Sequence, residues 1–202
     1  MSDDRRQPRR PAMMSPAAMA AFGGTVDPLK EIEAAHQTAA VLVHAGRAAH
    51  DPAMTARLVD LVEELGLSTV ADLWAHRPAR SLPGALWRLY VLREWVRRSP
   101  DEASLDYRAG VRFADVDHAV AGPADPPGPI EVTELADAIL AGVFEGDLAV
   151  ALERAAAFCR VVAAGRADRS EGEEAATRAA HLLDTADDLT AAAALWRQGD
   201  LA

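Results

Sequence analysis

Small and branched aliphatic residues recur at helical spacing along most of this chain. Apolar residues make up 50% of the sequence, and Ala, Leu and Val supply most of them, whereas aromatic residues make up only 5%. Alanine is the best helix former, and small side chains let helices approach one another closely. No segment shows a convincing apolar–polar alternation of the kind that a half-buried β-strand requires. The pattern therefore predicts an all-α fold.

Start and stop signals divide the pattern into about eight helices. Asp27-Pro28 and Asp51-Pro52 each join a capping side chain to a proline suited to the first helical turn. Gly66 and Gly165 are typical of helix ends. The helix that starts at Asp147 is apolar around most of its circumference, so we expect it at the centre of the fold. The helices should form an orthogonal or bundle-like domain and should begin near Asp27, Asp51, Ser68, Leu82, Ser99, Glu131, Asp147 and Ser170.

Two segments interrupt this periodicity. Residues 1–26 carry Arg, Pro, Met, Ala and Gly without a repeat, and we expect a disordered tail there, followed by a helical domain over 27–202. Residues 114–129 hold four prolines and two glycines, which predicts a connector without a helix. A connector of this length can separate a five-helix half of the domain from a three-helix half.

Charge and cysteine content restrict the compartment and the partners. The formal net charge is −10, so the chain as a whole repels a phosphate backbone. The single cysteine, Cys159, rules out an intrachain disulfide and a cysteine zinc site, and its apolar neighbours indicate a buried, inert thiol. No run is long enough to span a membrane, and residues 13–22 lack the continuous apolar core of a signal peptide. We therefore expect a cytoplasmic protein that does not enter membranes.

One segment departs from the acidic whole. Between His76 and Arg98, six arginines are accompanied by the single acid Glu94. An advance of 100° per residue places Arg93, Arg97, Arg98 and Tyr90 on an outer arc of the helix from Leu82, opposite a broad apolar arc. We expect this outer arc to be exposed and available to a partner. The candidate binding residues of the segment are Arg77, Arg80, Arg88, Arg93, Trp95, Arg97 and Arg98.

Arg88 is the exception on this helix, because it falls inside the apolar arc between Trp95 and Leu92. A buried guanidinium without a partner is strongly unfavourable, so Arg88 must pair or reach outward. One interpretation is an ion pair with a carboxylate on a neighbouring helix, or a side chain that extends to solvent. The other is an anion site for a carboxylate or phosphate, which arginine suits through its two parallel donors.

Residues 62–74, VEELGLSTVADLW, resemble the helix-turn-helix pattern of bacterial regulators. The resemblance consists of a helix, a turn at Gly66 and a second helix that begins at Ser68. It implies that residues 68–74 dock into a DNA groove. The segment departs from that family because its turn is about two residues too short before Thr69-Val70, and because the second helix carries Asp72 and no early Arg, Lys, Asn or Gln to read base edges.

The sequence contains no recognisable catalytic, metal-binding or nucleotide-binding motif, so we predict no catalytic residue, no metal ligand and no cofactor. The leading hypothesis is a non-enzymatic helical interaction or regulatory module whose partner is another protein or a second copy of the chain. The first alternative is a nucleic-acid-binding regulator that uses the basic segment 77–98. The second alternative, from a different class, is a small-anion site or an enzyme centred on Arg88.

Overall fold

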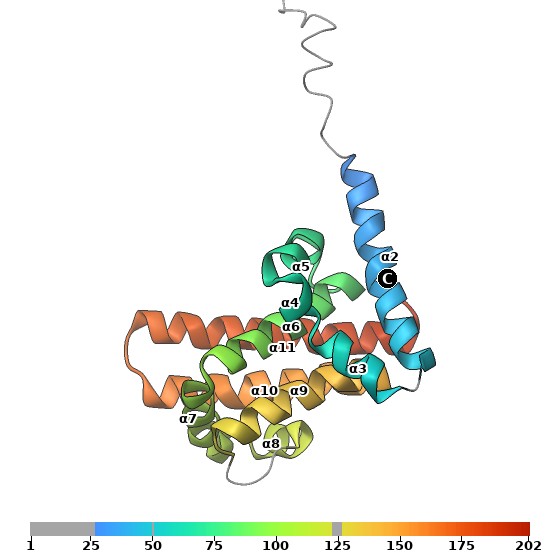
Figure 1. The fold of residues 1–202 in the computed structure, drawn as a ribbon. Helices are drawn as coiled ribbons and strands as arrows, with labels where there is room; N and C mark the ends of the chain where they lie inside the picture. Colours follow the sequence, from blue (N-terminus) through green and yellow to red (C-terminus); the bar gives the residue numbers. More distant parts are fainter. Residues whose placement is uncertain (1–26, 50, 123–126) are drawn as a thin grey trace, which may run out of the picture.

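The computed structural model describes residues 27–49, 51–122 and 127–202, and within these ranges all of the regular secondary structure is helical (Figure 1). The all-α prediction is therefore confirmed, while the predicted tail over 1–26 lies outside the described residues. The elements are α2 (Pro28–Ala49), α3 (Pro52–Val59), α4 (Leu61–Leu65), α5 (Leu67–Trp74), α6 (Leu82–Arg98), α7 (Pro100–Gly110), the 3-10 turn η1 (Val111–Phe113), α8 (Asp115–Ala121), α9 (Pro129–Glu145), α10 (Leu148–Arg169) and α11 (Glu173–Gln198). Among these residues, no helix is both long and apolar enough to cross a bilayer.

The described residues form ten α-helices rather than about eight, and both additions have local causes. The helix predicted from Asp51 is divided at Asp60, where ψ is 12°. The other addition, α8, lies inside the segment predicted to contain no helix, so that prediction was wrong. Asp115 and Asp117 occupy its first turn, where acids are favoured, and Gly122 ends it with a φ of 74°. The prolines of the segment all follow Gly122, so none of them interrupts α8.

The centre of the fold is α10, as its apolar circumference predicts. It packs against α7, α8, α9 and α11, and Figure 1 shows α10 and α11 side by side. Both helices bury many alanines, whose small side chains let neighbouring helices approach closely. The buried alanines are Ala149, Ala151, Ala155, Ala156, Ala157 and Ala163 in α10, and Ala175, Ala179, Ala186, Ala192 and Ala193 in α11.

The second axis of the fold is α6, which contacts α2, α5, α9 and α11. Because neighbours cover it on more than one side, residues predicted to face solvent are buried. Tyr90 is fully buried, and its hydroxyl donates a 2.5 Å hydrogen bond to the Leu58 carbonyl oxygen. Arg93 is only 1% exposed. The predicted outer arc of this helix is therefore corrected for Tyr90 and Arg93, since helical periodicity cannot reveal a second covered face.

The first turns of α2 project beyond the rest of the described chain (Figure 1). Leu29 and Ile32 belong to the apolar stripe predicted for this helix, yet they are 73% and 43% exposed. The same stripe becomes buried from Ala35 onward, through Ala39 and Val43. The helix therefore continues past the body that covers its apolar side.

Two glycines bring the backbones of α7 and α10 into direct contact. A Cβ atom added at Gly165 would lie 1.7 Å from the Asp106 carbonyl oxygen, and one added at Gly110 would lie 1.8 Å from the Val161 carbonyl oxygen. Neither backbone atom can move without displacing a helix. Gly165, which the sequence pattern suggested as a helix end, thus lies inside α10 and fixes its crossing with α7.

We expect Gly165→Ala to lower the free energy of unfolding by about 3 kcal/mol or more, because the two helices must separate to admit a methyl group. Gly142→Ala in α9 is the matched control. Its Cβ would lie 3.6 Å from the Ala151 Cβ, an ordinary contact, so helix propensity should leave that variant within about 1 kcal/mol of the parent. Urea denaturation followed by circular dichroism measures both, and equal stabilities would contradict the close crossing.

Candidate functional site

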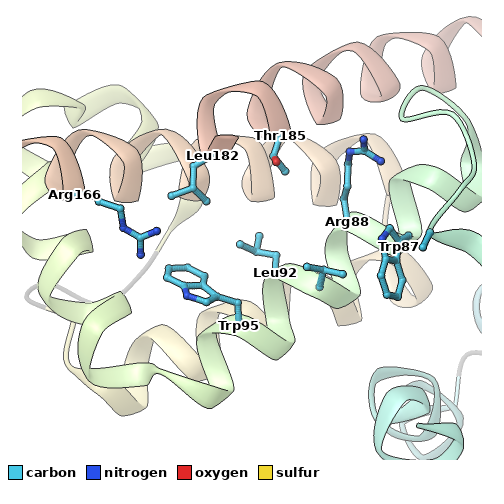
Figure 2. A pocket seen from close by; sticks show the side chains of 9 residues that line it. Trp87, Arg88, Leu92, Trp95, Arg166, Leu182 and Thr185 are labelled. Carbon is cyan, nitrogen blue, oxygen red and sulfur yellow. The ribbon is translucent and has the colours of Figure 1, made fainter. Parts of the chain in front are cut away.

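A cleft of about 380 Å3 opens between α6, α10 and α11 (Figure 2). We call it the tryptophan cleft. Its volume lies within the range of small-molecule sites, which are mostly apolar with a few placed polar groups. The lining residues are Ala75, Trp87, Arg88, Val91, Leu92, Trp95, Arg166, Leu182 and Thr185.

The wall that α6 contributes follows from its sequence spacing. Arg88, Val91, Leu92 and Trp95 are separated by three or four residues, so they share one helical face. The helix is started by Ser81, whose side chain accepts a hydrogen bond from the Gly84 backbone N–H and so fixes the first turn. The sequence grouped Arg88 with Trp95, and the structure places both in the same cleft (Figure 2).

At one end of the cleft, Arg88 is paired but not enclosed. Its Nη2 donates to Asp188 Oδ2 of α11 at 3.3 Å, and its Nη1 donates to the Gly84 carbonyl oxygen at 3.1 Å. Both Arg88 and Asp188 keep 26% of their side-chain surface exposed. Arg80 also approaches Asp188, with 3.6 Å between Nε and Oδ1. One carboxylate, that of Asp188, therefore pairs with both Arg80 and Arg88.

At the other end lies Arg166, which the sequence analysis missed (Figure 2). Its Nε donates to Asp106 Oδ2 at 2.8 Å, its Nη2 donates to Glu102 Oε1 at 3.3 Å, and its guanidinium lies 5.0 Å from the centre of the Trp95 ring. Its Nη1 has no hydrogen-bond partner among the described residues, yet no fully buried side-chain nitrogen or oxygen there lacks one. The Nη1 group is therefore not fully buried, and Arg166 is one of the residues that line the cleft. The sequence pattern ended this helix at Gly165, and a helix predicted to continue through Gly165 would have included Arg166.

The remaining candidate arginines are occupied within the chain, and Arg93 is the clearest correction. Its Nε donates to Asp137 Oδ1 at 2.6 Å, its Nη2 to Asp60 Oδ1 at 2.7 Å and its Nη1 to Glu63 Oε1 at 3.1 Å. Burial opposes its charge, but the hydrogen bond and ion pair with Asp137, together with Glu63 and Asp60, raise the pKa of Arg93. This arginine joins α6 to α9 and to the α3–α4 segment, so we assign it a structural role.

Apart from Arg93, the candidate arginines outside the cleft have weaker internal partners. Arg97 lies 3.2 Å from Glu63 Oε1 and 3.5 Å from Asp137 Oδ2. Loss of hydration raises the pKa of Glu63, against the opposing influence of Arg93. Arg98 is 65% exposed and lies 3.4 Å from Glu94. Arg77 donates a long, 3.4 Å hydrogen bond to the Leu73 carbonyl oxygen. Binding of an external partner to these residues stays a prediction.

We expect Arg93→Met to lower the free energy of unfolding by about 3 kcal/mol, because three carboxylates lose their buried cation and keep only the more exposed Arg97, which contacts two of them. The loss should shrink at low pH, where protonation removes those charges. Arg98→Met on the exposed side of the same helix is the control and should cost less than about 0.5 kcal/mol. Urea denaturation at neutral pH and at low pH tests this, and similar losses of stability for the two variants would disprove the structural role of Arg93.

Cys159 is fully buried, as its apolar neighbours predict, and burial raises the pKa of its thiol to about 12. The thiolate is the nucleophilic form, so this group is unreactive in the folded chain.

Among the residues that the structure describes, no group of three or more His, Cys, Asp or Glu side chains could hold a metal ion.

We expect iodoacetamide to leave Cys159 unmodified in the folded protein at about pH 8, close to the ordinary pKa of a thiol. The urea-unfolded chain should react at this one thiol, and mass spectrometry distinguishes the two. Rapid modification of the folded chain would show that the α10 environment opens readily.

The segment that resembles a helix-turn-helix forms two short helices, α4 and α5, joined at Gly66 with a φ of 83°. Val70 and Trp74 are buried, whereas Asp72 and Leu73 are exposed. The exposed side of α5 therefore presents an acid and an apolar residue, and DNA binding by this segment stays a prediction.

Comparison of the chain with protein-family models, curated proteins and solved structures finds no match.

Proposed function

We propose that this protein is a non-enzymatic, cytoplasmic helical module that binds a small amphipathic anion in the tryptophan cleft. The observation that carries the proposal is the lining itself: two arginines and an apolar wall that includes Trp87 and Trp95, with no carboxylate among the described residues that line it. An aromatic or aliphatic body fits such a wall, and a carboxylate or phosphate suits the forked donors of arginine.

The internal ion pairs of the site support this choice. Arg88 already holds a carboxylate, Asp188, at 3.3 Å, so its geometry is suited to anions. Because Asp188 also pairs with Arg80, a bound anion can approach Arg88 without leaving Asp188 unpaired. Arg166 lines the cleft and is held by Asp106 and Glu102, so a bound anion would meet a guanidinium that loses little side-chain entropy on binding.

The single hydroxyl in the lining belongs to Thr185, and it donates to the His181 carbonyl oxygen at 2.8 Å. It is therefore engaged in its own helix, and the lining includes no histidine, cysteine or acid that could activate it. These features favour binding over catalysis. A protein partner on the arginines outside the cleft, which the sequence suggested first, stays a prediction, with Arg80, Arg97 and Arg98 as its most accessible members.

The test compares three ligands with the same ten-carbon chain: decanoate, decanol and decylammonium, each below its micelle concentration, by isothermal titration calorimetry. Decanoate should bind most tightly. Arg88→Gln should weaken decanoate about tenfold, as expected for one lost charge-assisted hydrogen bond, and should change decanol little. Arg98→Gln, on the same helix but outside the cleft, should change neither ligand.

A second variant places the ligand in the cleft rather than elsewhere. Val91 lines the cleft and is 38% exposed, so Val91→Trp should fill the space without disturbing the core and should abolish binding of decanoate. Val150→Trp, at a position 46% exposed on α10 outside the cleft, is its control. Equal affinity for all three ligands, or binding that survives Val91→Trp, would reject the proposal.

A further inference from the structure

A second concave surface, unrelated to the tryptophan cleft, lies between α2, α4 and α5. It encloses about 410 Å3, and we call it the apolar groove. Three large side chains in it are solvent-exposed: Val41 by 63%, Leu65 by 51% and Leu73 by 37%. Exposed apolar side chains gathered in one hollow are typical of a surface that another segment covers. The full lining consists of Gln37, Thr38, Val41, Leu42, Leu61, Leu65, Val70, Leu73 and Trp74.

The polar groups of the apolar groove are already bonded within the chain. Trp74 Nε1 donates to Thr38 Oγ1 at 3.3 Å, and the Thr38 hydroxyl donates to the Ala34 carbonyl oxygen at 2.8 Å. Gln37 Nε2 donates to Glu33 Oε1 at 3.0 Å. The groove therefore offers apolar contact rather than polar recognition, which suits hydrophobic side chains of a polypeptide.

The sequence supplies such side chains immediately before α2. Met13, Met14, Met19 and Phe22 lie within the first 26 residues, outside the described ranges, and the positions between them are mostly alanine. Methionine adapts to irregular apolar surfaces because its side chain is unbranched and flexible. This segment, residues 13–22, is thus chemically matched to the apolar groove.

The chain length allows the segment to reach the groove. Val41 lies about 21 Å along α2 from Asp27, at 1.5 Å per residue. Met19 precedes Asp27 by eight residues, which span up to about 26 Å when extended. Residues 23–26 include Gly23 and Gly24, whose backbone freedom suits a reversal of direction. Residues 13–22 can therefore run back along α2 and cover its groove side.

Charge complementarity points to the same occupant. Four arginines, Arg5, Arg6, Arg9 and Arg10, precede the apolar segment, whereas the stretch before that segment contains only two acids. The groove has an acidic surround on its α4 and α5 side, where the exposed Glu64 and Asp72 directly precede Leu65 and Leu73. Among the residues that the structure describes, no basic one lines the groove.

We propose that the N-terminal segment 13–22 of this chain docks intramolecularly into the apolar groove between α2, α4 and α5, with its preceding arginines beside the acidic surround. The proposal concerns a different surface from the tryptophan cleft, so either can fail without the other. If the groove is instead occupied by a second copy, burial of the segment will depend on protein concentration.

The experiment labels the full-length Met19→Cys variant with bimane, a fluorophore whose emission moves to shorter wavelength when it is shielded from water. The native Cys159 is buried and will not be labelled in the folded chain. In the folded protein, emission should lie at shorter wavelength than in the urea-unfolded chain, and its position should not change on dilution.

Groove variants then locate the shielding. Adding Val41→Asp and Leu65→Asp should shift the emission to the value of the unfolded chain. The control pair Val116→Asp and Val150→Asp, at positions 77% and 46% exposed on other helices, should leave it unchanged. If the double groove variant does not fold, Val41→Asp alone, at the more exposed position, provides the same comparison.

Three results would overturn the proposal. The first is emission that already matches the unfolded chain in the Met19→Cys parent. The second is shielding that the groove substitutions leave intact, which would place the segment elsewhere. The third is shielding lost on dilution, accompanied by a dimer in sedimentation equilibrium, which would identify a second copy as the occupant.

Discussion

The backbone contact between α7 and α10 is the constraint on which the tryptophan cleft depends. Gly165 has no side chain, and this allows the Asp106 carbonyl oxygen to approach α10 more closely than any Cβ would permit. The same residue, Asp106, uses its carboxylate to hold Arg166 one position further along α10. A wider crossing would separate that pair, and Arg166 would lose the support that directs it toward Trp95.

The two buried arginines illustrate how similar side chains take different roles. Arg93 donates to three carboxylates from two parts of the fold, α9 and the α3–α4 segment, and each of its nitrogens has a partner. Arg166 lines the cleft and donates to two carboxylates, and its third nitrogen has no hydrogen-bond partner among the described residues. A fully satisfied guanidinium strengthens the junction of helices, whereas a partly satisfied one at a cavity wall creates a recognition group.

Local patterns predict this fold well where one physical rule decides. The helical class, the central position of α10 and the burial of Cys159 follow from spacing and composition. The patterns fail where tertiary neighbours decide. Periodicity assigns Arg93 and Tyr90 to solvent because it contains no information about neighbouring elements. In the structure, α9 and α3 cover a second side of α6 at these residues. The N-terminal turns of α2 show the reverse error, since no neighbour among the described residues covers the apolar Leu29.

The candidate site was accessible to sequence reasoning only in part. Arg88 and Trp95 were found together because they share a helix face, which needs no knowledge of the fold. Arg166 and Leu182 reach the cleft from α10 and α11, and no local rule connects them to α6. Gly165 was itself misleading, because a glycine that permits close packing resembles a glycine that ends a helix.

The alanine seam between α10 and α11 has a consequence for how this chain can change over generations. The methyl side chain of alanine can hardly be made smaller, and a larger side chain would force the two helices apart. Single replacements along the seam are therefore nearly always harmful, and accepted ones must arrive with a compensating change on the opposite helix. Neutral drift should accumulate instead on the outer surface of α11, where the alternatives are many.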